Sequence, residues 1–496
     1  MKKNNPHTPI MLREAMPAPS GTGRRLLTNS FYVLLAEGVS KAIAVALFLV
    51  MVRRLGPAGY GIFAFAIAWS ALIMTVGHFG LDQVLTREVA PAPERLHEYF
   101  ANTLAVKAMV AVPLVLVALT VVALTSSSTT AQAFFWVLMG ALAELVTSTS
   151  VASYQAFERL EFVPIVRILQ RLLIALVGIL VLLLGGGVVA IAAIYAGGSC
   201  FAALLSLFLL QRIAPIRFSF TPSTWLALIR LSLPVGIAGV LASALFRLDI
   251  PLLAFFASSA VVGEYGAAYR LLDTTVFIAF AVGAAAYPLF CKLTPDSEPS
   301  VGWVFKMSLK LLLAITLPIG VAIEVLAGTI VRTFFGVGYA NSVGALQLLA
   351  PTVVLFPVVL LSGYLLIGRN HAVAVTKIYA VGTAVNLALN IVLIPALSLY
   401  GAALTTSVCE LGLSAALLVA AGNETRGASW TSVLLGPVTA SAAMGVLLWL
   451  MRAHLVAAVL AGGPLYLVAL LAIERLVFPG ELVALRGSLR LRRSAA

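Results

Sequence analysis

The sequence has very little charge for its length. Only 10% of its 496 residues are Asp, Glu, Lys or Arg, whereas 61% are hydrophobic. A typical soluble domain has about a quarter of its residues charged, so this composition excludes an ordinary soluble protein. Apolar runs of roughly 20 residues, each long enough to cross about 30 Å of hydrocarbon, recur from Leu27 almost to Phe478. The sequence therefore predicts an all-α polytopic membrane protein.

Residue types that carry enzyme chemistry are also scarce. The three cysteines, Cys200, Cys291 and Cys409, have no paired spacing, so they suggest neither a disulfide framework nor a zinc site. The few Asp residues are too far apart for a DxD motif, and the five His residues form no HExxH motif. No Walker A pattern is present. We therefore expect a protein that is not an enzyme, with no catalytic residue, no metal and no cofactor.

Turn and charge clusters divide the chain into about fourteen predicted spans between residues 27 and 477. Lys and Arg concentrate in alternate connections. The other set of connections holds only Arg53, Arg54, Arg332 and Arg452. Basic connections face the cytoplasm, so we expect an even number of spans with both termini cytoplasmic. The net charge of +13 then reflects topology signals and contacts with anionic lipids, and it does not call for nucleic acid.

A weak internal repeat suggests two related halves. AGYGIFAFA at 58–66 follows the first predicted span, and GEYGAAYRL at 263–271 follows the seventh. Transporters are often built from such repeats, with the substrate site between them. We predict five regions: a disordered cytoplasmic tail (1–24), an N-terminal six-helix bundle (25–211), an amphipathic cytoplasmic linker (212–230), a C-terminal six-helix bundle (231–421), and a C-terminal helix pair with a basic tail (422–496).

Charged residues inside the predicted spans are the candidate site residues. A charge at the centre of a membrane helix costs about 2.5–3.5 kcal/mol on insertion scales, so it usually faces protein or water. Arg247 and Asp249 lie in the seventh span, and the pairs Arg270/Asp273 and Glu37/Lys41 have i,i+3 and i,i+4 spacing. If the halves face each other, all six could line one cavity. Further charges in the spans include Glu144, Arg167, Arg171, Glu324, Lys377 and Glu410.

Each of these charges also has a structural interpretation. Any single one could form an ion pair that only holds helices together. For Arg53 and Arg54 we favour snorkelling and helix-dipole contacts at a helix end. For Asn386 and Asn390, at i,i+4 in an apolar helix, interhelical hydrogen bonding is favoured over ligand contact. The excess of cationic groups as a set, however, suits an anionic substrate, because Arg binds phosphate with a two-pronged fork.

Six segments along the chain carry family-like motifs: RRLGPAGYGIFAFA at 53–66, HFGLDQVLTREVA at 78–90, GEYGAAYRLLD at 263–273, YPLFCKL at 287–293, GYANSVGALQLLAP at 338–351 and NLALNIVLIPALSLYGAALTT at 386–406. In this order they resemble the polysaccharide transporters of the multidrug/oligosaccharidyl-lipid/polysaccharide exporter superfamily. The resemblance implies fourteen helices, with two pseudo-symmetric six-helix bundles around a central cavity plus a C-terminal pair. It also implies flipping of undecaprenyl-diphosphate-linked oligosaccharide across a bacterial inner membrane, for cell-surface polysaccharide biosynthesis.

On this hypothesis the protein works by alternating access, and Arg270, Arg247 and Lys41 hold the lipid diphosphate. Candidates for coupling to a proton or sodium gradient are Asp249, Asp273, Glu37 and Glu410. Expected partners are the lipid-linked substrate, membrane lipids, a polysaccharide polymerase and a chain-length regulator. The alternatives are a cation-coupled exporter of small amphipathic molecules, a lipid II flippase, and a membrane glycan polymerase or acyltransferase. The first-helix arginines of lipid II flippases are absent, since Glu37 and Lys41 stand there instead.

Overall fold

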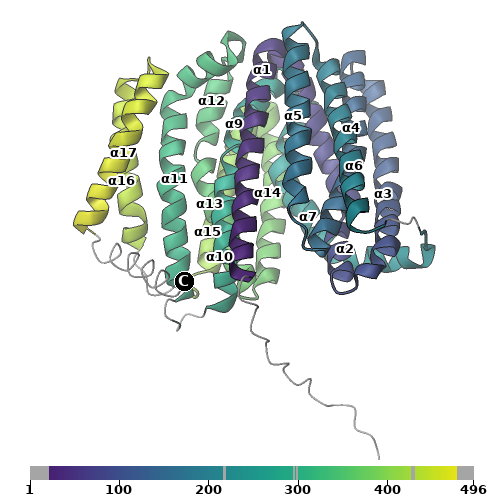
Figure 1. Ribbon diagram of the computed structural model, residues 1–496. Helices are drawn as coiled ribbons and strands as arrows, with labels where there is room; N and C mark the ends of the chain where they lie inside the picture. Colours follow the sequence, from purple (N-terminus) through teal and green to yellow (C-terminus); the bar gives the residue numbers. More distant parts are fainter. Residues whose placement is uncertain (1–21, 216–218, 294–296, 298–299, 426–429, 478–496) are drawn as a thin grey trace, which may run out of the picture.

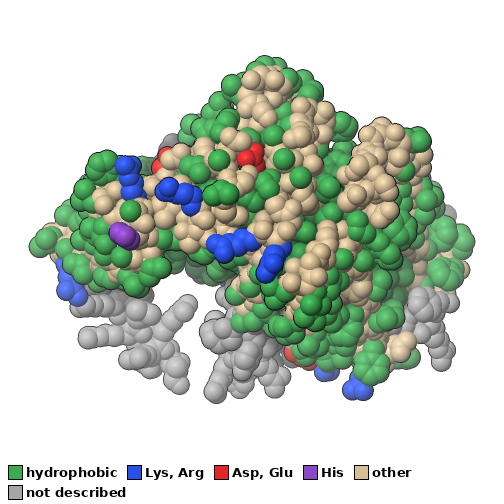
Figure 2. All heavy atoms as spheres, turned by 90° about the horizontal axis from the view of Figure 1, so that it is seen from above, with side chains coloured by type: hydrophobic (Ala, Val, Ile, Leu, Met, Phe, Trp, Pro, Cys, Tyr) green, Lys and Arg blue, Asp and Glu red, His purple; other side chains and the backbone are tan. Residues whose placement is uncertain are grey.

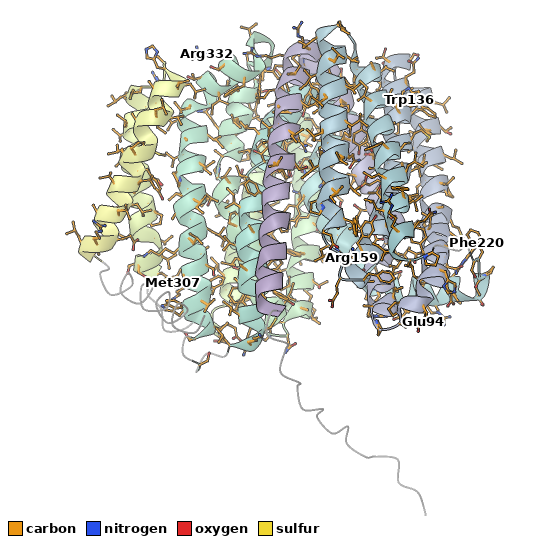
Figure 3. The ribbon with its side chains drawn as sticks, in the orientation of Figure 1. Glu94, Trp136, Arg159, Phe220, Met307 and Arg332 are labelled. Carbon is orange, nitrogen blue, oxygen red and sulfur yellow. The ribbon has the colours of Figure 1, made fainter. Side chains whose placement is uncertain are left out.

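The computed structural model describes residues 22–215, 219–293, 297, 300–425 and 430–477, and within them the side chains from Gly38 onward except those of Ala238 and Ala242. Within these ranges the regular structure is helical, with no strand. The predicted tail 1–24 and the basic C-terminal tail lie almost entirely outside the described residues. Figure 3 places Arg332 and Glu94 at opposite ends of the helices, and we call these the Arg332 end and the Glu94 end.

The N-terminal half begins with one helix that crosses the molecule twice. Helix α1, Thr22–His78, is interrupted at Gly56, whose φ of 66° and ψ of 179° are not helical, and Pro57 follows. Glycine tolerates this positive φ without a Cβ clash, and the chain turns back toward the Glu94 end (Figure 1). The remaining elements are α2 Leu81–Val89, the 3-10 turn Pro93–Arg95, α3 Leu96–Thr125, α4 Ser128–Ala156, α5 Phe162–Leu183 and α6 Val188–Ile213.

The second half follows a short connection and ends in a separate helix pair. Its elements are α7 Pro222–Arg247, α8 Asp249–Phe256, α9 Ser259–Asp273, α10 Val276–Lys292, α11 Val301–Ile330, the turns Val331–Phe335 and Val337–Tyr339, α12 Ser342–Leu349, α13 Thr352–Gly368, α14 Ala372–Leu397 and α15 Leu399–Ala420. The pair α16 Trp430–Leu450 and α17 Leu455–Val477 packs on α11 at the edge of the molecule (Figure 1). Helix α7 starts at Pro222, so the last part of the predicted linker 212–230 is helical.

The number and character of the helices agree with a membrane protein. Thirteen helical segments of the described chain are long and apolar enough to cross a membrane. Because the first of these segments contains the turn at Gly56, it supplies two crossings, in agreement with about fourteen predicted spans. Large apolar side chains on the outer helices are exposed, for example Leu176 and Leu204. Such a surface suits lipid and would be unfavourable in water.

The two halves touch closely at the Arg332 end. A Cβ atom added to Gly61 of α1 would lie 1.7 Å from the backbone oxygen of Ser259, and one on Gly263 of α9 would lie 1.9 Å from that of Pro57. Only glycine permits this backbone approach. Tyr339 donates its hydroxyl to the carbonyl oxygen of Val52 at 3.1 Å. The repeat segments recognised at 58–66 and 263–271 therefore pack directly against each other.

Arg53 adds a polar contact across the same end. Its Nε donates to the carbonyl oxygen of Phe334 at 3.0 Å, and its second guanidinium nitrogen donates to that of Thr333. These carbonyls belong to the π turn that follows α11 in the second half. Arg53 therefore contacts a helix end, as predicted, but that of a helix in the other half. Seen from this end, basic side chains lie in a row across a largely apolar face (Figure 2).

At the Glu94 end, helix α7 packs against the N-terminal half. Gly80, with φ 75°, lies so close to α7 that an added Cβ would come 2.9 Å from the nitrogen of Gly236. Buried Asn102 of α3 accepts hydrogen bonds from the Thr221 amide and the Trp225 indole, each at 2.8 Å. Although α7 opens the second half in sequence, its first turns are thus anchored to the first half.

Candidate functional site

Arg270 and Asp273 form an ion pair on α9. Arg270 Nη1 lies 3.3 Å from Asp273 Oδ2, in the i,i+3 arrangement that the spacing predicted. The side chains are 41% and 33% exposed, so the pair is accessible and not sealed in a dry core. Buried Tyr60 of α1 lies within electrostatic range of both charges. Arg270 is therefore positioned near the contact between the two halves.

The N-terminal half brings its own charges toward Arg270. Arg171 of α5 lies within electrostatic range of Arg270, of Glu144 on α4 and of Arg167 one turn earlier on its own helix. Tyr195 of α6 is within range of Glu144, Arg171 and Arg270. The sequence analysis noted Arg171 as a charge in a span but did not assign it to the site. A single sequence could not show that charges of α4 and α5 lie within electrostatic range of α9.

Asp249 lies in a different environment from Arg247, although they are two residues apart. The helix breaks at Leu248, between α7 and α8. Asp249 is 3% exposed, whereas Arg247 is exposed. Among the described residues, no cation lies within ion-pair distance of Asp249. The two charges therefore do not form one paired unit, because residues two apart on a helical segment point to different sides.

Three neutral donors surround Asp249 instead. Oδ2 accepts from the Tyr265 hydroxyl at 3.0 Å and from Thr406 Oγ1, and Oδ1 accepts from Asn390 Nδ2 at 2.9 Å. Asn390 also donates to Asn386 Oδ1 at 3.0 Å. These bonds join α8, α9, α14 and α15. Interhelical hydrogen bonding by Asn390 is thereby confirmed, and we call these five residues the Asp249 cluster.

Glu410 adds a second buried carboxyl beside this cluster. It lies one turn beyond Thr406 on α15, is 7% exposed and is within electrostatic range of Asp249. Its Oε2 has no hydrogen-bond partner among the described residues, and neither does Asn390 Oδ1. Asp249 and Glu410 are thus neighbouring buried carboxyl groups, and in the described part of the chain no cation is paired with either of them. Such a site can take up a proton or a small cation, because either one offsets buried negative charge.

The predicted first-helix pair is only partly described. Lys41 is half-buried on α1. The side chain of Glu37 lies outside the described residues, so the Glu37/Lys41 pairing stays a prediction.

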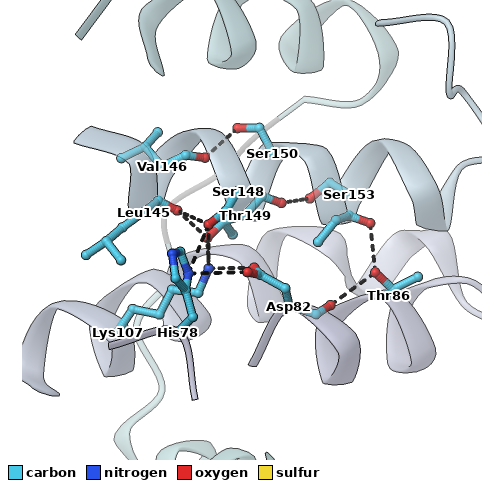
Figure 4. A network of polar contacts seen from close by, with 11 residues as sticks. His78, Asp82, Thr86, Lys107, Leu145, Val146, Ser148, Thr149, Ser150 and Ser153 are labelled. Atoms are coloured by element: carbon cyan, nitrogen blue, oxygen red, sulfur yellow. Dashed lines mark hydrogen bonds and ion pairs between the residues drawn. The ribbon is translucent and has the colours of Figure 1, made fainter. Parts of the chain in front are cut away.

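A polar network in the N-terminal half was not predicted (Figure 4). Lys107 of α3 is fully buried and donates to Asp82 Oδ1 at 2.5 Å and to the hydroxyls of Ser148 and Thr149, each at 2.9 Å. His78 Nδ1 lies 3.4 Å from Asp82 Oδ2. Lys107 is a charge inside an apolar run, and that signal could have identified it. All three of its ammonium hydrogens are used, so the network holds α2 onto α3 and α4.

The pKa of Asp82 reflects this network. Burial on α2 raises the pKa of its carboxyl, but the Lys107 ammonium and His78 lower it, and the net effect is a pKa below the usual value. Asp82 is therefore ionised at neutral pH and balances the Lys107 charge.

Comparison with known proteins assigns the chain to a family. A family model described as "Polysaccharide biosynthesis protein" matches residues 26–294, which is more than half of the chain. The protein belongs to this family. The predicted membership of the polysaccharide transporter group is thus confirmed. Comparison with curated protein sequences finds no significant match.

Solved structures show the same fold at low sequence identity. The lipid II flippase MurJ in an inward closed conformation is 14% identical, with a TM-score of 0.76 over 89% of this chain and 98% of that chain. An inward-facing multidrug resistance MATE transporter of the MOP superfamily is also 14% identical, with a TM-score of 0.58 over 81% and 96%. A MOP superfamily transporter from Pyrococcus furiosus is described as having a binding pocket of reverse polarity. It is 14% identical, with a TM-score of 0.52 over 81% of this chain and 95% of that chain.

Proposed function

We propose that the protein is a flippase that moves undecaprenyl-diphosphate-linked oligosaccharide across the bacterial inner membrane by alternating access. The family match supports a role in polysaccharide biosynthesis. The repeat segments pack closely at Gly61 and Gly263, and alternating access would require this contact between the halves to open and re-form. We infer the same orientation as from the sequence, with both termini cytoplasmic and the Arg332 end outside.

The observation that carries this proposal is the accessible Arg270–Asp273 pair in the middle of an apolar fold. An Arg side chain that served only to join two helices would be expected to be more fully enclosed. Within the described ranges the polar contact of Arg270 is the one with Asp273, so guanidinium donors remain for a second partner, and the planar fork matches a phosphate group. We propose that it binds the lipid diphosphate, with the exposed Arg247 and with Lys41 of α1 assisting.

We further propose that the Asp249 cluster and Glu410 couple transport to a proton or sodium gradient. Asp273 is the weaker candidate, because Arg270 already balances its charge. Among the residues that the structure describes, the donors to Asp249 are neutral and one oxygen of Glu410 has no partner, so an arriving cation would stabilise both carboxylates. The cluster joins α8, α9, α14 and α15, so a change in its charge can alter how these helices pack.

The biological setting follows from the proposed substrate. The flippase would deliver oligosaccharide units for cell-surface polysaccharide, with a polymerase and a chain-length regulator acting on the units afterward. Anionic membrane lipids would contact the basic residues near the membrane surface.

Glycan export in cells tests the function. In a strain that lacks its own oligosaccharide flippase, this chain should restore surface glycan, and Arg270→Ala should abolish that export. Arg270→Lys, which keeps the charge but loses the fork, should leave membrane abundance near normal and reduce export. Asp273→Ala is the control for a purely structural pair, which would lower abundance at least as much as export. Normal export by Arg270→Ala at normal abundance would contradict the proposal.

A further inference from the structure

The hydroxyl of Tyr269 on α9 is bound to the end of another helix. It donates to the carbonyl oxygen of Phe246 at 2.8 Å, in the last turn of α7. Helices α7 and α8 are separated at Leu248, and Pro251 follows in the first turn of α8. Proline has no amide hydrogen, and its ring clashes with the carbonyl four residues earlier, here that of Arg247. Tyr269 therefore holds a weakened part of the backbone, directly beside Arg247, from a different helix.

Tyr269 is also in contact with the Asp249 cluster. Its ring stacks on that of Tyr265, with the centroids 6.0 Å apart and the planes inclined by 29°. Tyr265 is fully buried and donates its hydroxyl to Asp249 Oδ2 at 3.0 Å. Both rings pack in one apolar cluster with Leu253 of α8. Movement of Tyr265 therefore displaces Tyr269, because close-packed side chains leave little free volume between them.

The proposed anion site lies one turn further along the same helix. Tyr265, Tyr269 and Asp273 follow one another at intervals of four residues, so they form one stripe on α9. Arg270 is the residue after Tyr269, and its Nη1 lies 3.3 Å from Asp273 Oδ2. Tyr269 is thus placed between the carboxylate proposed to bind a cation and the arginine proposed to bind the diphosphate.

Packing alone does not require the hydroxyl of Tyr269. A phenylalanine would keep the ring, its stacking on Tyr265 and its apolar contacts. The hydroxyl adds a directional bond to a backbone carbonyl. That bond fixes α9 relative to the end of α7, so it can carry a displacement from one helix to the other.

We propose that Tyr269 is a positioning residue that transmits the charge state of Asp249 to Arg270. The inference rests on the proposed function, which supplies the cation at Asp249 and the diphosphate at Arg270. A proton or sodium ion occupies lone pairs of the carboxylate that otherwise accept hydroxyl donors, so Tyr265 loses its bond and Tyr269 moves with it. The bond from Tyr269 to Phe246 then changes, and Arg270 is reoriented because it is the next residue on the helix.

The consequence is that cation binding weakens diphosphate binding. The coupling is reciprocal, so the diphosphate also weakens cation binding. Each ligand then favours the release of the other, which is what an exchange of cation for substrate across the membrane requires.

Calorimetric titration of inorganic pyrophosphate into the purified full-length protein in nanodiscs tests the transmission. Asp249→Asn stands for the neutral carboxyl group, and we expect it to weaken binding about fivefold or more, as for a moderate coupling between sites. Direct electrostatics predicts the opposite sign, because loss of a negative charge favours an anion. In Tyr269→Phe, the additional change Asp249→Asn should alter the affinity less than about twofold, because the link between the sites is cut.

Tyr466→Phe is the matched control. Tyr466 of α17 donates its hydroxyl to the carbonyl oxygen of Ala314 at 2.6 Å, so this variant removes the same kind of interhelical bond away from the Asp249 cluster. Here Asp249→Asn should still weaken binding about fivefold or more. Size-exclusion profiles and melting temperatures check that each variant is folded. Tyr265→Phe, which cuts the link at its bond to Asp249, replaces Tyr269→Phe if the latter is not folded, with the same expected result.

The outcomes separate this inference from the proposed function. If Asp249→Asn weakens binding by the same factor with and without Tyr269→Phe, Tyr269 has only a structural role and the inference is overturned. Unchanged or stronger binding by Asp249→Asn alone, or no pyrophosphate binding by the unchanged protein, also overturns it. Failure of the flippase proposal would show instead as normal glycan export by Arg270→Ala at normal abundance.

Discussion

Asn390 Nδ2 donates to Asp249 Oδ1 at 2.9 Å and thereby joins α14 to α8 inside the second half. The residues are far apart in sequence, yet the bond fixes the orientation of a carboxylate that is 3% exposed. Because Tyr265 and Thr406 donate to the other carboxylate oxygen, Asp249 is held as an acceptor from three helices. A change in its charge would disturb all of these bonds at once.

Ion coupling can be tested by neutralising this carboxylate. Asp249→Asn removes the charge at nearly constant volume, so we expect loss of gradient-driven glycan export when the variant and the unchanged protein are compared at equal membrane abundance. Transport into membrane vesicles under an imposed sodium or proton gradient provides the measurement, and Ser362→Ala, which lies elsewhere in the second half, serves as a control. Unchanged gradient dependence in Asp249→Asn would exclude this carboxylate as the coupling group.

The Lys107–Asp82 pair should contribute strongly to stability. Asp82→Asn leaves a fully buried ammonium group without its counter-charge, and breaking a buried pair in this way costs about 3 kcal/mol or more. The expected result is a lower melting temperature of the detergent-solubilised protein at neutral pH. An exposed charge on the same face, Glu94→Gln, should have little effect. A melting temperature equal to that of the unchanged protein would contradict the assigned pair.

The same pair gives a pH dependence with a defined sign. The folded-state pKa of Asp82 is lowered from its usual value of 3.8, since Lys107 and His78 outweigh the effect of burial. The stabilisation of the folded state by ionised Asp82 is therefore complete above pH 3.8. It is lost as the pH falls through the lower, folded-state pKa. The stability difference between the unchanged protein and Asp82→Asn should shrink below pH 3.8. If the stability difference between the two proteins grew on acidification, the pKa of Asp82 would be raised in the folded state and not lowered.

Contact at the Arg332 end should depend on the two facing glycines. A Cβ on Gly61 would lie 1.7 Å from the Ser259 oxygen, so Gly61→Ala forces the backbones of α1 and α9 apart. Cross-linking across this end, between cysteines placed in the two halves, should become less efficient. Gly197→Ala is the matched control, because an added Cβ there has no neighbour within 4 Å. Equal cross-linking in both variants would contradict a close-packed contact.

Topology can be tested by cysteine accessibility. Ser127 precedes α4 at the Arg332 end, and Ser223 lies in the first turn of α7 at the Glu94 end; both are exposed. In a protein without other cysteines, Ser127→Cys should react with an impermeant reagent added outside the cell. Ser223→Cys should react only after permeabilisation. The reverse pattern would overturn the proposed orientation.

The sequence by itself determined the fold class and most of the helix pattern. Apolar runs of membrane-spanning length can satisfy their backbone hydrogen bonds only as helices in lipid, so the predicted spans follow α1 to α17 closely. The i,i+3 spacing of Arg270 and Asp273 likewise fixed their pairing, because both lie on one face of one helix. These are local properties, and local sequence is sufficient to predict them.

Only the tertiary structure decided which charges meet. Arg247 and Asp249 are two residues apart in sequence, yet helix packing buries Asp249 and leaves Arg247 exposed. Packing of α8 against α14 and α15 gives Asp249 neutral donors, while the fold brings Arg171 of α5 within electrostatic range of Arg270 on α9. Such partners depend on helix packing in three dimensions. Apolar and small residues allow many packing arrangements, so the spacing of charges along the chain could not select among them.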